Sequence, residues 1–354
     1  MNRPRLPQRP WVRFALFLPL VALVVGLLWW HGPSWNLVWD AFTVVRWDWV
    51  FAAIGLNLVS VLARSLAWET VIRQALPSPR PGFPLVFSAF SVGLFANAIL
   101  PGRIGELARV AVLNRRLPPR RGAWATLVGT VFAHRVFDVI PVIGLIVYVL
   151  LTARIPAWAI TSLEVFVGIG VALFAFALAT ARLRHRATLD ELGVVKRLLA
   201  MGRQGLAVMR APLPAVVAIF FQTCGWLCQL FAVWASMRAF DINLALPAAG
   251  LVLLLMNVAT VFPLWPGNVG LLQFAIALPL TSYGIAYAHG VAFGFGLQAI
   301  EASVGVGVGL VFLAREGLSF GMVRVMPDAS QAEVPEDEEA SEARAVLQRE
   351  HVSR

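Results

Sequence analysis

The chain has little charge for its length and almost no lysine. Only 14% of its 354 residues are charged, whereas 59% are hydrophobic, and the mean hydropathy is +0.76. Soluble domains carry about 25% charged residues, so this composition excludes a water-soluble globular protein. Several apolar runs reach the roughly 20 residues that a helix needs to cross a bilayer. They lack the short alternating segments of a membrane β-barrel, and we therefore expect an all-α polytopic membrane protein.

Cysteine is scarce too, and the motifs of common enzymes are missing. The two cysteines, Cys224 and Cys228, lie in one apolar run, which excludes a secreted disulfide framework and a CxxC metal knuckle. The sequence has no nucleophile–base arrangement, no metal-ligand cluster, no aspartate-rich pyrophosphate motif and no GxxxxGK[ST] phosphate loop. We therefore expect no enzymatic activity, no metal and no cofactor.

The basic residues are unevenly distributed. Without residues 328–354, which we expect to form an acidic disordered cytoplasmic tail, the chain has 26 basic and 11 acidic residues. The excess falls in alternate loops, at 1–13, 73–80, 109–121 and 182–210. This predicts that those loops and both termini face the cytoplasm. We therefore expect a protein of the cytoplasmic (inner) membrane that meets anionic lipid rather than nucleic acid.

The hydropathy pattern predicts about six full spans and two broken hairpins. The spans are expected at 14–30, 49–72, 124–151, 157–179, 213–240 and 290–314. Two further apolar segments, 83–113 and 247–285, each carry a Pro-Gly break. If the basic loops all face the cytoplasm, each of these two segments must enter and leave the membrane on the same side. We therefore expect two re-entrant hairpins, the first cytoplasmic and the second on the outer side.

The two breaks share a sequence pattern. Pro101-Gly102-x-Ile104-Gly105 matches Pro266-Gly267-x-Val269-Gly270 at an offset of 165 residues. Each half reads span, span, hairpin, span, in opposite orientations. We therefore expect inverted repeats over about 14–151 and 157–314, within one transmembrane domain at 1–320. Matching Pro/Gly-interrupted segments of this kind point to the substrate site of a transporter, although a Pro-Gly pair can also be a simple helix kink.

Charged side chains beside the first break form the main candidate site. Arg103, Glu106 and Arg109 lie on one face of a half-helix that we expect to start near Gly102. Its free N-terminal amides and two guanidinium groups suit an anion such as phosphate. The alternative is an Arg–Glu–Arg triad that only holds the hairpin together. The full set of predicted lipid-headgroup residues is Pro101, Gly102, Arg103, Gly105, Glu106, Arg109, Pro266, Gly267, Gly270 and Gln273.

Charges inside the spans form a second set. Each costs about 2.5–3.5 kcal/mol on insertion scales and suggests function by default. Arg135 and Asp138 are spaced to pair, and His134 is a titratable neighbour. Glu301 needs a basic partner on another helix, or a proton. We interpret the set as a buried charge network or proton-coupling group: Arg64, His134, Arg135, Asp138 and Glu301.

Three motifs resemble those of a known family. The segment from Leu100 to Arg109 (LPGRIGELAR), His134-Arg135-x-x-Asp138, and Pro263-x-x-Pro266-Gly267-x-x-Gly270 resemble the flippase-like membrane domain of lysylphosphatidylglycerol synthases. The resemblance covers about 10–320 and implies lipid movement between leaflets. We expect a stand-alone member without the aminoacyltransferase domain, because few residues follow the last span. Family members often carry glutamate where this sequence has Gln273, which leaves the outer half-site less charged.

These observations favour a lipid flippase or lipid-binding translocator whose substrate is an anionic phospholipid or a polyprenyl glycolipid. One alternative is a non-transporting scaffold or regulator of envelope-lipid synthesis, with a lipid-synthesis enzyme as partner. A membrane transferase acting on lipid phosphates and an ion or small-solute transporter are the remaining alternatives.

Overall fold

A computed structural model describes six ranges and six isolated positions between 160 and 175. The ranges are 34–76, 80–99, 104–118, 123–156, 211–261 and 266–315. All regular structure in these ranges is helical, as we predicted. The predicted span at 14–30, the first break at 100–103, the tail and most of the span at 157–179 lie outside the described residues.

Four helices are long and apolar enough to cross a membrane: α3 (Trp47–Ala75), α6 (Ala123–Thr152), α9 (Pro212–Ala239) and α12 (Tyr287–Arg315). They coincide with four of the predicted spans. α9 begins on a proline, whose missing N–H is of no consequence in the first turn. α3 has Asp48 in its first turn and Arg73 in its last, and both charges favour the helix dipole.

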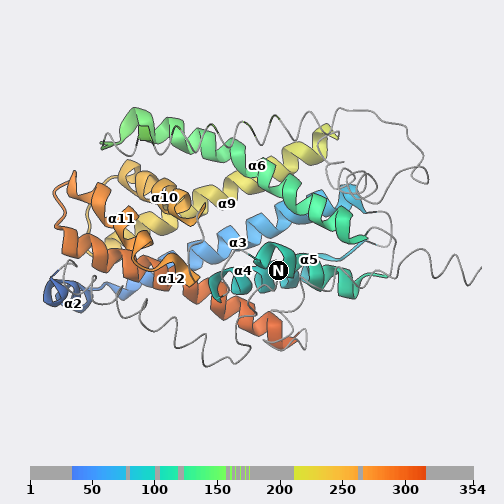
Figure 1. The fold of residues 1–354 in the computed structure, drawn as a ribbon, viewed down its shortest axis with the longest axis horizontal. Coiled ribbons are helices and arrows are strands. Elements are labelled where there is room, and N and C mark those ends of the chain that lie inside the picture. Colours follow the sequence, from blue (N-terminus) through green and yellow to red (C-terminus); the bar gives the residue numbers. More distant parts are fainter. Residues whose placement is uncertain are drawn as a thin grey trace, which may run out of the picture.

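Four shorter helices form two pairs where we predicted broken hairpins. α4 (Phe83–Ile99) packs on α5 (Gly105–Arg116), and α10 (Leu246–Val261) packs on α11 (Leu271–Thr281). At 11 to 17 residues, each is shorter than a full crossing. The turn η4 (Pro266–Asn268) precedes α11, and the short helix α2 (Trp35–Thr43) packs on α12. The two pairs lie toward opposite ends of α3 (Figure 1).

The long helices α3 and α9 pack side by side and run antiparallel (Figure 1). The backbone N–H of Arg46, before α3, donates to the carbonyl oxygen of Ala239 at the end of α9, at 2.9 Å. Midway along both helices, the Ser60 hydroxyl donates to the carbonyl oxygen of Gly225 at 2.7 Å. A Cβ atom on Gly225 would lie 2.8 Å from Cγ of Arg64, so the glycine permits this close crossing.

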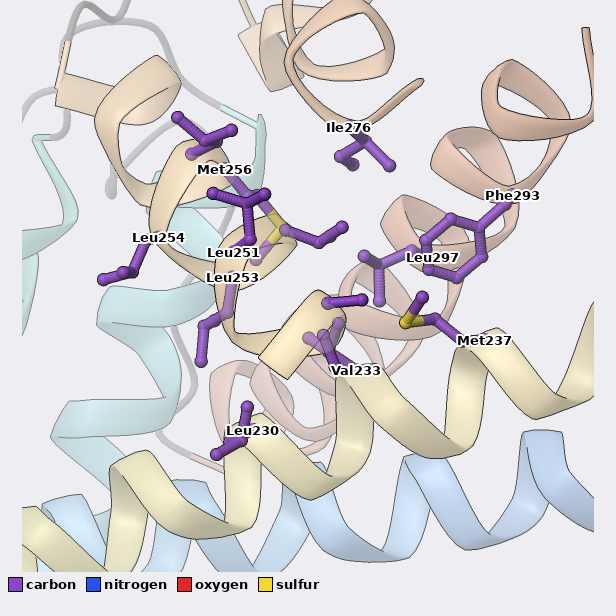
Figure 2. Close-up of a cluster of buried hydrophobic side chains, with 14 of the residues drawn as sticks. Leu230, Val233, Met237, Leu251, Leu253, Leu254, Met256, Ile276, Phe293 and Leu297 are labelled. Atoms are coloured by element: carbon purple, nitrogen blue, oxygen red, sulfur yellow. The ribbon is translucent and has the colours of Figure 1, made fainter. Parts of the chain in front are cut away.

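The remaining helices surround this pair in matching positions. α4 packs on α12, and α10 packs on α6; likewise α5 packs on α6, and α11 packs on α12. The buried apolar side chains fall into two main clusters. One joins α3, α4, α5 and α6 around Trp68, Ile72 and Leu113. Figure 2 shows the other, in which α9, α10, α11 and α12 contribute side chains such as Met237, Leu253 and Phe293.

Candidate functional site

A cavity of about 330 Å³ lies beside the crossing of α3 and α9, and residues of both helix pairs line it. Its polar lining is unusually rich for a site between apolar helices. The polar side chains are Asn57, Ser60, Arg64, Asn97, His134, Arg135, Gln229, Thr260, Asn268, Gln298 and Glu301. Polar groups at this depth in a membrane protein mark a functional site by default.

Arg64 and Gln229 meet at the centre of this cavity. Each lies one helical turn after Ser60 or Gly225, the residues in contact at the crossing. Helical side chains lean toward the N-terminus, so both lean back toward the crossing, where Nη2 of Arg64 donates to Oε1 of Gln229. The guanidinium lies over the ring of Trp226, 5.0 Å from its centroid. Within the described residues, Nε of Arg64 is buried and has no acceptor.

A chain of ion pairs connects α5 to α6 at one side of the cavity. Glu106 pairs with Arg109 on its own helix and with Arg135 of α6. Arg135 also pairs with Asp138, at 3.1 Å. The Arg135 side chain is 46% exposed and lines the cavity. The Arg135 guanidinium group therefore both joins the α4–α5 pair to α6 and faces the cavity.

The other buried groups of α6 are held by neighbouring helices. Asp138 accepts hydrogen bonds from Nε2 of Gln222 and from Nε1 of Trp226, the latter at 2.8 Å. His134 lies 3.1 Å, through Nε2, from the carbonyl oxygen of Arg64. Because a carbonyl oxygen only accepts, Nε2 of His134 carries the proton. These contacts fix α6 against α3 and α9.

Two of the predicted headgroup residues lie behind the cavity. Arg109 is only 3% exposed, and its guanidinium lies over the rings of Trp68 and Phe90, 4.5 and 5.4 Å from the centroids. α5 begins at Gly105 rather than near Gly102, and the Gly105 N–H donates to Oδ1 of Asn97 at 2.9 Å. One of the amides that we expected to bind an anion is therefore already satisfied.

The second break is closed by neutral amide groups. Gly267 and Gly270 have φ angles of 68° and 93°, a region that favours glycine. Oε1 of Gln273 accepts from the Gly270 N–H at 2.7 Å, and its Nε2 donates to Oε1 of Gln298, also at 2.7 Å. Nε2 of Gln298 donates to the carbonyl oxygen of Gly267. Among the described residues, these bonds join the α10–α11 pair to α12 through uncharged groups alone.

Glu301 faces the cavity from α12 and has no ion-pair partner within 4 Å among the described residues. Its carboxylate accepts one hydrogen bond, from Nε2 of Gln229 at 3.4 Å. By contrast, Glu69 pairs with Arg73 at 2.8 Å. The sequence predicted either a basic residue or a proton as the partner of Glu301. The described helices place no basic residue within ion-pair distance of it.

The structure thus divides the predicted residues into three groups. Glu106, Arg109, Arg135 and Asp138 form one ion-pair network. The cavity is lined by Arg64, His134, Arg135, Gly267 and Glu301. Pro101, Gly102 and Arg103 lie outside the described residues, and Pro266 begins η4. Within the described ranges, no three His, Cys, Asp or Glu side chains come together as metal ligands.

Three polar partners on α9 were not predicted from the sequence, namely Gln222, Trp226 and Gln229. The signal was present, because polar residues in an apolar span are uncommon. The offset of 165 residues between the two Pro-Gly breaks also relates Arg64 to Gln229.

Comparisons with known proteins agree with the membrane character of this site. A UPF0104 membrane protein of Pyrococcus horikoshii is 28% identical over 131 residues, which is 37% of this chain and 38% of that protein. A UPF0104 membrane protein of Methanocaldococcus jannaschii is 23% identical over 202 residues, or 55% of this chain and 82% of that protein. No solved structure matches the chain. Residues 13–309 match the family described as "Lysylphosphatidylglycerol synthase TM region", and the chain belongs to this family.

Proposed function

We propose that this protein moves a lipid with a phosphate-bearing headgroup between the leaflets of the cytoplasmic membrane, with both termini inside. The observation that carries the proposal is the position of Arg64 and Arg135 on one cavity between the two helix pairs. The Arg64 side chain lines the cavity and has one buried N–H without an acceptor in the described residues, and Arg135 is half exposed. Two guanidinium groups suit phosphate, which accepts paired hydrogen bonds from arginine.

The size of the cavity supports a headgroup rather than a whole lipid. At about 330 Å³, it is at the lower end of the range for small-molecule sites. The acyl chains would remain in the bilayer between helices. In this arrangement Glu106 and Arg109 hold Arg135 from behind, so we assign the headgroup contacts to Arg64 and Arg135 in place of Arg109.

We further propose that the two halves are inverted repeats. An offset of 165 residues converts the bounds of α3 (Trp47–Ala75) into those of α9 (Pro212–Ala239) to within one residue. It also relates Ser60 to Gly225, and these two residues touch where the antiparallel helices cross. The packing of α4 on α12 and of α10 on α6 supports the same relation. A pseudo-two-fold axis would then pass through the Ser60–Gly225 contact.

Alternating access follows from two helix pairs that close one cavity from opposite sides. In the proposed orientation α4 and α5 form the inner pair, and α10 and α11 form the outer pair. The inner pair is held by the Glu106–Arg135 ion pair, and the outer pair by the hydrogen bond between the Gln273 and Gln298 amide groups. A phosphate that binds Arg135 competes with Glu106 for the same guanidinium group. Headgroup binding therefore favours release of the inner pair, which is what a transport cycle needs.

A translocation assay tests the proposal. Full-length protein is reconstituted into vesicles containing phosphatidylglycerol with a fluorophore on one acyl chain, and an impermeant reductant reports arrival of lipid in the outer leaflet. We expect lipid to move faster than in protein-free vesicles, and Arg64→Gln to slow this movement at least about tenfold, a change of about 1.4 kcal/mol in the barrier. Arg46→Gln is the control, because Arg46 forms an exposed pair with Asp48.

Two results would contradict the proposal. Wild-type protein that moves lipid no faster than empty vesicles would favour the scaffold alternative. An Arg64→Gln variant that moves lipid at the wild-type rate would remove the central cavity from the mechanism.

A further inference from the structure

The Glu301 carboxylate differs from three other carboxylates of the described helices that are buried or partly buried. Glu69, Glu106 and Asp138 each have an arginine within ion-pair distance. Glu301 has only the amide of Gln229, at 3.4 Å, and it faces the cavity directly. A carboxylate at this depth without a cation is costly unless it binds one or takes up a proton.

Gln229 separates Glu301 from the nearest cation of the cavity. Its Oε1 accepts from Arg64, and its Nε2 donates to Glu301. The amide is therefore oriented by a positive charge at one end and a negative charge at the other. A phosphate that binds Arg64 would sit beside this bridge, in the same cavity as the Glu301 carboxylate.

The charged groups that the described helices place in the cavity or in the adjoining ion-pair network balance. They are three guanidinium groups and three carboxylates: Arg64, Arg109 and Arg135, with Glu106, Asp138 and Glu301. A singly charged phosphodiester adds one negative charge to a site shielded from water. Like charges repel strongly in such surroundings, and one proton on a carboxylate restores the balance.

Glu301 is the group that can accept this proton. Asp138 already has an arginine and two hydrogen-bond donors, and Glu106 has two arginines. His134 already carries a proton on Nε2 and lies against Arg64 and Phe90, so a second proton there would add a cation beside an arginine.

No other titratable group of the described helices competes at this position. α4, α10 and α11 have no titratable side chains, and α9 has only cysteines and Arg238. On α2, Asp40 is exposed. On α12 itself, Tyr287, His289 and Arg315 lie in the first and last turns, about three or more turns from Glu301. The charged groups that face Glu301 across the cavity are thus Arg64 and Arg135.

We propose that Glu301 takes up a proton when a phosphate-bearing headgroup binds at Arg64, so that the bound lipid carries a proton with it. This inference rests on the proposed function, because it assumes that the headgroup enters this cavity. By linkage, proton binding and headgroup binding strengthen each other equally. A proton gradient would then drive the lipid in the direction of proton flow.

The test measures headgroup affinity against pH. Short-chain phosphatidylglycerol is titrated into the detergent-solubilised full-length protein between about pH 5.5 and 8, where the phosphodiester stays ionised. If one proton is taken up with the headgroup, the binding affinity falls by up to about tenfold for each unit of rising pH. We expect this slope in the wild type and in Glu301→Asp, which keeps a carboxylate, and a flat profile in Glu301→Gln. Glu69→Gln removes a carboxylate of α3 that is paired with Arg73, and it should keep the wild-type slope of affinity against pH.

Four results would overturn the inference. They are a flat profile in the wild type, the same slope in Glu301→Gln, an affinity set by sodium concentration rather than by pH, and no phosphatidylglycerol binding at any pH. A folded Glu301→Gln variant is verified by size-exclusion chromatography, and Glu301→Asp gives the comparison if the glutamine variant does not fold.

The vesicle assay separates this inference from the proposed function. An imposed pH gradient should change the rate of lipid movement in the wild type, and should not change whatever rate remains in Glu301→Gln. If the pH gradient changes the rate of lipid movement in neither protein, the proton linkage is overturned, but the proposed translocation is not contradicted. Headgroup binding with the expected pH slope, but without any lipid movement, would contradict translocation and support the linkage.

Discussion

The Ser60 hydroxyl donates a hydrogen bond to the carbonyl oxygen of Gly225 at 2.7 Å, and the two residues are 165 positions apart. The same offset separates the two Pro-Gly breaks. If the two halves are the inverted repeats that we propose, equivalent positions touch where α3 and α9 cross. This contact places Arg64 and Gln229, one turn further along each helix, on either side of the crossing.

The close approach of α3 and α9 at Gly225 can be tested by one methyl group. In Gly225→Ala the new Cβ would lie 2.8 Å from Cγ of Arg64, so either the Arg64 side chain or the two helices must shift. We expect a loss of about 1–3 kcal/mol, measured as a lower Tm in detergent. Gly55→Ala is the control on α3, because a Cβ there meets nothing within 4 Å. Equal effects of the two substitutions would contradict the crossing.

The ion-pair network should be sensitive to the loss of its shared carboxylate. Glu106→Gln leaves the buried Arg109 without an ion-pair partner and takes from Arg135 one of its two. We expect a loss of about 3 kcal/mol in the free energy of unfolding, as for removal of one partner from a buried pair. Arg46→Gln, which breaks an exposed pair, should cost at most about 1 kcal/mol. Comparable losses in both variants would show that Glu106 does not hold the inner pair.

The Gln273 amide, and not a charged group, holds the second break, so the loss of this amide should lower the stability of the protein. Gln273→Leu leaves the Gly270 N–H and Oε1 of Gln298 without their partner. We expect a cost of about 1–3 kcal/mol. Asn243→Leu is the comparison, because it removes an amide whose hydrogen bonds are exposed, so its effect should be smaller. Thermal denaturation of both variants decides, and the reverse order would contradict this geometry.

The antiparallel packing of α3 and α9 predicts a specific cross-link. Arg46 and Ala239 are joined by a backbone hydrogen bond of 2.9 Å, so cysteines at these two positions should form a disulfide on oxidation. The background carries Cys224→Ser and Cys228→Ser. Arg46→Cys combined with Pro212→Cys, at the far end of α9, should not cross-link. Digestion and peptide mass spectrometry distinguish the two pairs, and the opposite pattern would mean parallel helices.

Much of the fold could be predicted because the bilayer imposes simple rules on sequence. A helix must be apolar over about 20 residues to cross, and α3, α6, α9 and α12 meet that condition. The two Pro-Gly breaks indicated the two helix pairs, because a Pro-Gly dipeptide does not continue a helix easily. Ion pairs at i, i+3, such as Arg135 with Asp138, were predictable from helical geometry alone.

The partners across helices could not be predicted in the same way. The apolar residues of α3 and α9 follow no strong helical period, so periodicity does not indicate which face of each helix meets the other. The Glu106–Arg135 ion pair depends on how α5 lies against α6, and the contacts of Asp138 with Gln222 and Trp226 depend on α9. Only the repeat offset relates such distant positions, and it identifies Gln229 as the counterpart of Arg64.

The most direct test of the account is to identify the lipid that the protein retains. Wild type, Arg64→Gln and Arg46→Gln are purified in mild detergent, and the bound lipid is identified by mass spectrometry. The account predicts one class of phosphate-bearing lipid enriched over the bulk membrane in the wild type and in Arg46→Gln, and lost in Arg64→Gln. The same lipid in the same amount in all three proteins would contradict headgroup binding at Arg64.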